Sequence, residues 1–427
     1  MKGSCFIESA AGEEFFIKHQ PAIFATNFFI SSMNISFDNT ENAFAYKSVE
    51  DLKRAKYLFT SMNYHWLVNA GVRLTPFAMK TGLPVRGLIR DTIFKQFVGG
   101  ETLGETAAVA NILAKYGADV ILDYGIEGKE GEANFERVTQ EFIKVINFAA
   151  TQPHIPFISI KITAFARFSL LQRLHEAPRL RSGIHDNEAE EEEWKRVRER
   201  MYRICSAAAE KNVGVLVDAE ESWIQDPIDR LTIEMMETFN KEKPTVYNTI
   251  QLYRHDRLHF LKLSYSISRQ KNFVLAVKLV RGAYMEKERA RAAQKGVQPP
   301  IQPNKQSSDA DYNAAVAFCV ENLENIACIV ATHNESSCLF AVELMERKGL
   351  PLHHPHLHFS QLYGMSDHIS FNLSKAGFWV SKYLPFGPLK EVIPYLMRRA
   401  QENSSVSGQT GRELFLIKKE LKRRKTE

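Results

Sequence analysis

Between residues 117 and 390 the chain alternates short, almost wholly apolar runs with longer amphipathic stretches. The apolar runs are rich in Val, Ile, Leu and Phe, which is typical of strands that are buried on both faces. The runs are DVILDY (119–124), FISIKIT (157–163), VGVLVDAE (213–220), YNTIQLY (247–253), VLAVKLV (274–280), IACIVATH (326–333), HLHFSQLY (356–363) and FWVSKYLPFG (378–387). The stretches between them are long enough for helices. The pattern therefore predicts parallel strands joined by helices.

Eight such strands favour a closed TIM-type (βα)8 barrel over an open, doubly wound sheet. The downstream ends of the runs support this choice, because polar side chains stand there. These are Asp123, Lys161, Asp218, Gln251, Lys278, Thr332, His333, Gln361 and Tyr383. In a barrel those ends meet at one mouth, where active sites are built. Strands also end in polar residues where they meet solvent, but that explains charged groups at so many ends less well.

The chain outside this pattern divides into three regions. Residues 1–32 lack helical or strand periodicity, so we expect a disordered or mis-assigned extension. Residues 33–116 form a predicted N-terminal helical region, with Ser48 and Thr102 as N-caps. The predicted barrel domain spans 117–405, and 406–427 is a basic C-terminal tail. The tail predicts a short helix that is either a solvated end or a contact with anionic lipid.

Composition and charge exclude several classes of protein. The net charge of +5 over 427 residues is mild, and no basic stripe interleaves with aromatics, so we expect no nucleic-acid partner. No apolar run is long enough to span a membrane. The five cysteines are odd in number and scattered, which favours the reducing cytoplasm. The histidines of LHHPHLHF (352–359) cluster at the entry to a strand and lack a nearby carboxylate, so we expect no metal site.

One predicted helix carries an unusual polar face. Tyr395, Arg398, Arg399 and Glu402 follow one another at i, i+3, i+4 and i+7, which places them on one side of a helix. Paired guanidinium groups bind a carboxylate through two parallel hydrogen bonds, better than lysine can. The alternative is a surface arginine pair that forms salt bridges with Glu391 and Glu402.

Other residues at the predicted mouth suit anion binding or catalysis. Lys161 and Lys278 are each either a Schiff-base amine, as in barrel aldolases, or a fixed cation for an anionic ligand. Asp218 is a carboxylate that can accept hydrogen bonds or tune a neighbouring pKa. Arg281 and Gly282 place bare backbone beside a cation, which suits a phosphate.

Several longer motifs together resemble the proline dehydrogenase family. They are KLVRGAYM…ER (278–289), VDAEE (217–221), ATHN (331–334), QLYGM (361–365), KYLPFG…VIPYLMRRAQEN (382–403) and ISFDNTENAF (35–44). They cover nearly the whole chain from Met33 onward, and the double-arginine motif is the most specific of them. The spacing is similar to the monofunctional, eukaryotic-like branch, with no aldehyde dehydrogenase domain following.

The resemblance implies a function and its partners. It implies a distorted (βα)8 barrel that holds FAD and oxidises L-proline to Δ1-pyrroline-5-carboxylate by hydride transfer. A membrane quinone would accept the electrons, and a separate pyrroline-5-carboxylate dehydrogenase would use the product. We therefore expect a cytoplasmic protein, with peripheral contact at the inner face of the membrane as a further expectation.

The resemblance also implies roles for individual residues. Asp218 and Lys278 would form the catalytic pair. The substrate would contact Lys161, Leu279, Tyr383, Tyr395, Arg398 and Arg399. The cofactor would contact Gln251, Lys278, Arg281, Gly282, Ala283, Thr332 and His333. Asp123 and Glu127 would form a gate opposite the arginines. Many family members have arginine where this chain has Lys278, and a lysine donates without the two-pronged geometry of arginine.

Two other functions fit the same residues. The first is a Schiff-base aldolase that uses Lys161 on the same barrel. The second is a barrel without enzymatic activity that binds an anionic ligand through Arg398 and Arg399.

Overall fold

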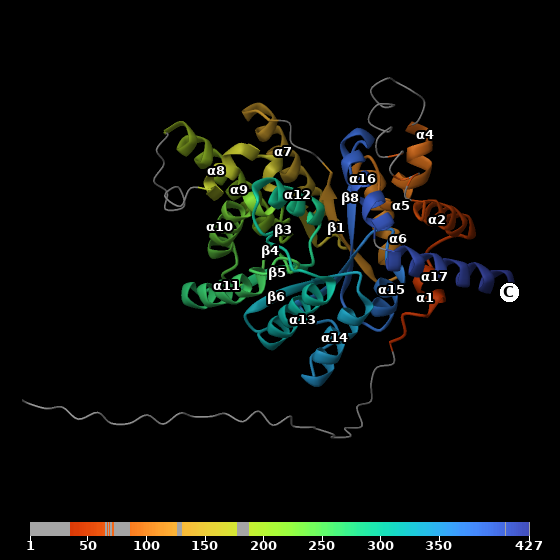
Figure 1. Cartoon of the computed structure of the whole chain (residues 1–427). Helices are drawn as coiled ribbons and strands as arrows, with labels where there is room; N and C mark the ends of the chain where they lie inside the picture. The colour runs from red at the N-terminus through yellow and green to blue at the C-terminus, as the bar shows by residue number, and fades with distance from the viewer. Residues whose placement is uncertain are drawn as a thin grey trace, which may run out of the picture. The chain divides into compact units, whose positions relative to one another are not determined.

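Eight parallel strands pair in sequence order, and the last pairs with the first to close a barrel (Figure 1). The strands are β1 (Ala118–Tyr124), β2 (Phe157–Ile160), β3 (Gly214–Val217), β4 (Val246–Gln251), β5 (Leu275–Val280), β6 (Ile326–Ala331), β7 (Leu357–Leu362) and β8 (Val380–Phe386). Closure occurs where Val120 lies beside Lys382 and Asp123 beside Pro385. The predicted (βα)8 barrel is thus confirmed, with each strand inside or close to its predicted run.

The structure is a computed structural model that describes residues 35–64, 66, 68, 71, 86–125, 130–176, 188–405 and 407–426. The expectations for residues 1–32 and for Glu127 lie outside these ranges. Helices that follow strands are α7 (Glu132–Ala149), α8 (Phe168–Glu176), α9 (Glu188–Lys211), α10 (Ser222–Phe239), α11 (Arg257–Lys271), α12 (Met285–Lys295), α13 (Lys305–Glu321), α14 (Glu335–Arg347), α15 (Asp367–Lys375) and α16 (Leu389–Ser405). A 3₁₀ turn, Ile162–Ala164, follows β2.

The inside of the barrel is filled by side chains, so the barrel encloses a packed core. A buried cluster combines Ile121, Phe157, Leu216, Tyr247, Ala276, Ala327 and Ile329 from six strands, with Trp379 and Tyr383 packed against it. Because strand side chains alternate between faces, these positions fix which residues point inward. Lys278 is two residues beyond Ala276 and points inward, whereas its neighbour Leu279 points outward.

The N-terminal region is helical over most of the residues that the structure describes. It contains α1 (Thr40–Phe44), α2 (Val49–Met62), α4 (Arg86–Ile89), the π-helix Arg90–Phe94, α5 (Lys95–Phe97) and α6 (Leu103–Ala114). Both predicted caps are confirmed. Ser48 Oγ accepts the Asp51 N–H at 3.1 Å, and Thr102 Oγ1 accepts the Glu105 N–H at 3.3 Å.

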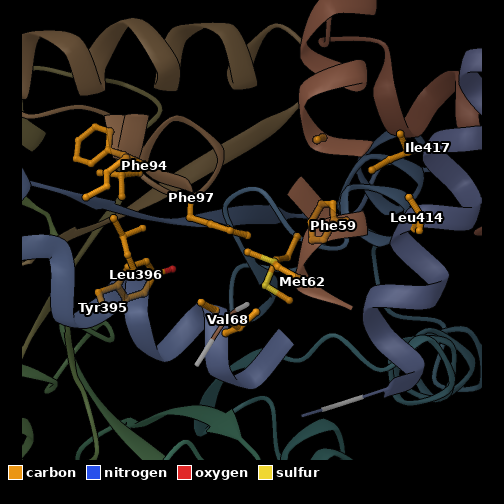
Figure 2. Close-up of a cluster of buried hydrophobic side chains, with 14 of the residues drawn as sticks. Phe59, Met62, Val68, Phe94, Phe97, Tyr395, Leu396, Leu414 and Ile417 are labelled. Carbon is orange, nitrogen blue, oxygen red and sulfur yellow. The ribbon is translucent and has the colours of Figure 1, made fainter. Parts of the chain in front are cut away.

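This N-terminal region holds α16 in place through a second hydrophobic core. Figure 2 shows Phe94 and Phe97 beside Tyr395 and Leu396 of α16. Leu396 is fully buried. Burying a leucine side chain contributes about 1.5–3 kcal/mol, so the apolar side of α16 anchors the helix that also carries the arginines.

The C-terminal tail forms helix α17 (Ser407–Thr426), which lies against α1 and α2 (Figure 1). Leu414, Leu416 and Ile417 are buried in the same core as α16. Arg424 donates to the carbonyl oxygens of Phe44 (2.8 Å) and Lys47 (2.7 Å), at the end of α1. The helix is therefore docked on the N-terminal region rather than forming a solvated end.

Candidate active site at the barrel mouth

The central group of the mouth is the Asp218 carboxylate, which follows β3 directly. Ser159 Oγ of β2 donates to Asp218 Oδ1 at 2.8 Å, and Tyr383 OH of β8 donates to Oδ2 at 2.8 Å. Lys278 Nζ of β5 forms an ion pair with Oδ1. Side chains of three other strands thus hold this one carboxylate through both of its oxygens.

Two carboxyl groups in this mouth have pKa values moved in opposite directions. Burial alone would raise the pKa of Asp218, but the charges of Lys278 and Lys161 and the hydrogen bonds leave it below its usual value. Burial raises the pKa of Asp123 to about 6, because Lys161 opposes the shift only in part and the Asp218 charge adds to it. Because their pKa values differ, the two neighbouring carboxyl groups can have different protonation states at the same pH.

A cleft opens beside this cluster, between β1, β2 and α16. It contains about 380 Å³ of free volume, including its opening to solvent. It is lined by Asp123, Tyr124, Gly125, Phe142, Lys161, Ala164, Glu391, Tyr395 and Arg398. Two cations and two carboxylates therefore face one small space that aromatic rings also border.

Helix α16 brings its polar face to this cleft because of a sharp turn at its start. Gly387 has φ +136°, a conformation that favours glycine, and Pro388 follows it before the first helical turn. The two arginines then diverge. Arg398 lines the cleft. The Arg399 guanidinium lies 5.5 Å from the centroid of the Tyr395 ring, and its charge contributes to the lowered pKa of His333.

A second polar group gathers at the start of α14. The Arg281 guanidinium donates to Thr332 Oγ1 at 2.7 Å and Ser337 Oγ at 3.0 Å, and pairs with Asp309 at 2.7 Å. A helix N-terminus beside an arginine and hydroxyl groups suits a phosphate or diphosphate. The adjacent Gly282 has φ +145°, and a Cβ there would come within 2.1 Å of the Tyr253 ring. No other residue fits that position.

Two further mouth residues have defined partners. Burial lowers the pKa of His333 to about 3, helped by the charges of Lys382 and Arg399, so its ring is neutral at physiological pH. His333 Nδ1 lies 2.8 Å from Ser366 Oγ. Gln251 Nε2 donates to the Glu220 carbonyl at 3.1 Å. Gln251 Oε1 is buried and accepts no hydrogen bond within the described ranges.

The structure brings most of the predicted residues into these two groups. The first contains Asp123, Lys161, Asp218, Lys278, Tyr383, Tyr395 and Arg398, and the second contains Arg281, Gly282, Thr332 and His333. Leu279 is not brought to either. Its side chain lies on the outer face of β5, and its carbonyl accepts from Tyr312 OH. Ala283 is exposed.

Sequence reasoning missed two residues that the structure places here. Glu391 lines the cleft, and it precedes Tyr395 by four residues and Arg398 by seven. The same helical spacing that selected the arginines could have selected it. Ser159 lies two residues before Lys161 on β2 and so shares its inward face, but a buried serine at that position gives no sign of its partner.

Both groups lie within the part of the chain that matches a known family. The model of the family described as proline dehydrogenase matches residues 107–412. The chain is 36% identical over 370 residues to the carbapenem antibiotics biosynthesis protein CarD of Pectobacterium carotovorum subsp. carotovorum, covering 86% of this chain and 94% of that protein. It is 34% identical over 388 residues to proline dehydrogenase 1, mitochondrial, of Dictyostelium discoideum, covering 81% and 67%.

A solved structure supports the fold independently. Proline utilization A from Bdellovibrio bacteriovorus matches with a TM-score of 0.66 at 22% identity, over 87% of this chain. This chain spans only 37% of that larger protein. With the family model covering most of the chain, these similarities show that the protein belongs to the proline dehydrogenase family.

Proposed function

We propose that this protein oxidises L-proline to Δ1-pyrroline-5-carboxylate, with FAD as the hydride acceptor and a quinone as the final electron acceptor. One observation carries the proposal. The cleft combines Lys161 and Arg398 with Asp123 and Glu391 beside the buried Asp218–Lys278 pair. A site with both charges suits a zwitterionic amino acid, because each end of the substrate finds an opposite charge.

The cations of the cleft would bind the substrate carboxylate. Arg398 and Lys161 approach it from α16 and β2, and Arg399 adds charge from behind the Tyr395 ring. The rings of Tyr383 and Tyr395 would pack against the pyrrolidine carbons. Binding at the carboxylate is remote from the reacting carbon, so it orients the C–H bond without taking part in the chemistry.

Other predicted contacts act less directly. Leu279 faces away from the mouth and would contribute only by packing behind β5. Asp123 would form a gate with Glu127, which lies outside the described residues. Neither the packing role of Leu279 nor the gate role of Asp123 affects the proposed binding of the substrate carboxylate by Arg398.

The residues at the mouth fit FAD. The unused acceptor Gln251 Oε1 suits an N–H of the flavin ring. The diphosphate suits Arg281 and Thr332 at the N-terminus of α14, with Gly282 and Ala283 contributing backbone and His333 adjacent. Lys278 would donate to the ring edge while it pairs with Asp218. When bound, FAD would supply the two-electron hydride acceptor that no side chain can provide.

The two carboxyl groups would divide the proton chemistry. A lone pair on nitrogen must stabilise the developing C=N bond, so the substrate ammonium has to lose a proton. Asp218 receives hydrogen bonds from three side chains and stays ionised beside Lys278, which stabilises charge. Asp123 lines the cleft, and its raised pKa of about 6 suits it to take the proton from the amine.

The partners of the reaction follow from its products. The product would pass to a separate pyrroline-5-carboxylate dehydrogenase, and a quinone in a membrane would take the electrons. No helix among the described residues is long and apolar enough to cross a bilayer. In our proposal a cytoplasmic protein would reach the quinone by peripheral contact at the inner face of the membrane.

The test is the visible spectrum of the purified protein before and after anaerobic addition of L-proline. The proposal predicts a flavin spectrum that proline bleaches and that an electron-accepting dye restores. A colourless protein whose Lys161 is trapped by borohydride with a keto substrate would favour the aldolase instead. Proline binding without bleaching of bound flavin would contradict the oxidation.

A further inference from the structure

The C-terminal helix α17 contacts residues next to the turn that joins β6 to α14, although the helix and the turn are far apart in sequence. The turn comprises residues 332–334 and carries Thr332 and His333. Glu413 of α17 is 2% exposed and accepts a hydrogen bond from the Ser366 N–H. The hydroxyl of the same serine lies 2.8 Å from His333 Nδ1. One serine thus connects α17 to the histidine ring.

The residue before Glu413 pairs with the residue that follows this turn. Arg412 Nε and Nη2 donate to the two carboxylate oxygens of Glu335 at 2.8 and 3.2 Å. Glu335 is the first residue of α14, directly after the turn. His368 Nε2 lies 3.0 Å from Glu335 and its Nδ1 lies 3.9 Å from Glu413. The two contacts of α17 are therefore parts of one partly buried network.

Ser366 has a backbone conformation that needs such support. Its φ of +50° is left-handed, which is uncommon for a residue other than glycine. This conformation directs the Ser366 N–H to Glu413 and its side chain to His333. Without the acceptor on α17, the fully buried N–H of Ser366 would lack its hydrogen bond. The left-handed conformation of Ser366 would then be less stable.

We propose that Arg412 and Glu413 are positioning residues of the cofactor site, which hold His333 and Thr332 in the geometry that binds the flavin nucleotide. The inference rests on the proposed function, because it assigns the β6–α14 turn to FAD. It makes α17 a functional part of the barrel mouth. Glu413 acts through Ser366, and Arg412 acts through Glu335.

The experiment compares five single variants and one double variant of the full-length holoenzyme by the rate at which FAD is released, followed by the fluorescence of free flavin. Glu413→Ala and Ser366→Ala should release FAD about tenfold faster, the scale of one lost hydrogen bond. Glu413→Gln keeps an acceptor for the Ser366 N–H and should behave like the parent. His333→Ala removes the ring that is being positioned.

Glu420→Ala is the matched control. Glu420 is fully buried on the same helix, but it pairs with Arg423 at 2.9 Å and Arg424 at 2.7 Å and does not contact the turn. This variant should lower the unfolding temperature as Glu413→Ala does, while FAD release well below that temperature stays at the parental rate. A general loss of stability would instead accelerate release in both variants.

A double variant separates positioning from packing. In a His333→Ala background, Glu413→Ala should add less than twofold to FAD release, because no ring remains to be positioned. Equal release rates in Glu413→Ala and Glu420→Ala would overturn the inference and leave the proposed function standing. So would a full tenfold effect in the His333→Ala background. A parent protein that takes up no FAD would overturn the proposed function together with the inference.

Discussion

The Tyr383 hydroxyl donates a hydrogen bond to Asp218 Oδ2 at 2.8 Å, between the ends of β8 and β3. The Lys278 ammonium lies 5.1 Å from the centroid of the same tyrosine ring and pairs with the other oxygen of Asp218. Tyr383 therefore has two separable parts. Its hydroxyl group fixes a buried carboxylate, and its ring forms a wall of the mouth.

The ring should limit which substrates are oxidised. A closed wall over the pyrrolidine carbons leaves little room for a hydroxyl group, so L-proline should be preferred over 4-hydroxyproline. Tyr383→Ser opens this wall and should narrow the ratio of kcat/KM for the two substrates by about tenfold, the scale of pocket discrimination against a small group. The measurement is steady-state kinetics with both substrates.

Tyr383→Phe is the matched control for this prediction. It keeps the ring but removes the donor to Asp218, so it should lower the rate with both substrates and leave their ratio unchanged. If the serine variant discriminates as strongly as the parent, another residue selects the substrate.

The opposite pKa shifts of the two carboxyls predict opposite effects on stability. Asp123 has a pKa of about 6 in the folded protein, against 3.8 as its ordinary value. The folded state therefore holds a proton that the unfolded state has lost, and stability falls as pH rises between these values. Above this range, Asp123→Asn should raise the free energy of unfolding of the flavin-free protein by about 2–3 kcal/mol.

The gain from Asp123→Asn should disappear as pH falls below about 4, where both states of the parent are protonated. Asp218→Asn should have the opposite effect and lower the free energy of unfolding at neutral pH. The pKa of Asp218 is lowered in the folded protein, so its ionised form adds stability above its ordinary pKa, and this is lost as pH falls through the folded value. Denaturant titrations over a pH series measure both. If the increase in the free energy of unfolding from Asp123→Asn does not vary with pH, ionisation of the Asp123 carboxyl is not the cause of that increase.

The docking of α17 changes how membrane contact must be tested. Removing residues 414–427 would also remove Leu416 and Ile417 from the core, so a deletion would confuse folding with lipid binding. Lys418, Lys422 and Lys425 are exposed and can be replaced by glutamine together. If the tail binds lipid, this triple variant should sediment less with anionic vesicles, since each lysine contributes about 1 kcal/mol near such a surface. Equal bound fractions for variant and parent would exclude the contact.

The barrel could be predicted because its signal is repeated along the chain. Most of the eight runs are apolar at consecutive positions, which is typical of strands that are covered on both faces. The location of Asp218, Lys278 and Tyr383 at one mouth followed from strand direction alone. Their mutual contacts did not, because the inward direction of Lys278 depends on strand register and the barrel core.

Buried polar pairs were not predictable, because each needs a partner distant in sequence. Lys382 is fully buried beside Asp367, 2.8 Å away, yet a lysine in a strand normally indicates an exposed edge. Glu413 lies in the segment that the sequence indicates to be a basic tail. Its hydrogen bond with the Ser366 N–H becomes visible only in the docked helix. Leu279 was assigned to the substrate by motif, whereas side-chain alternation places it outside the barrel.

The arginines of α16 provide the most direct test of the whole account. If Arg398 binds the substrate carboxylate, its removal leaves a charge without its partner in a partly desolvated site, which costs about 2–5 kcal/mol. The proline concentration that half-reduces the flavin should then rise by about thirtyfold or more in Arg398→Met. FAD occupancy should stay at the parental level, because Arg398 lines the cleft rather than the group around Arg281. We expect a similar loss in Arg399→Met, and Arg347→Met, which replaces an exposed arginine on α14, is the surface control.

The measurement is an anaerobic titration with L-proline of the parent, Arg398→Met and Arg399→Met, with flavin absorbance recorded and flavin content determined beforehand. If the arginines bind the substrate carboxylate, proline should bleach the parent flavin fully, and both variants should need far more proline at equal flavin content. A parent flavin that proline leaves unreduced, or variants that reach half-reduction at the parental concentration, would contradict this expectation.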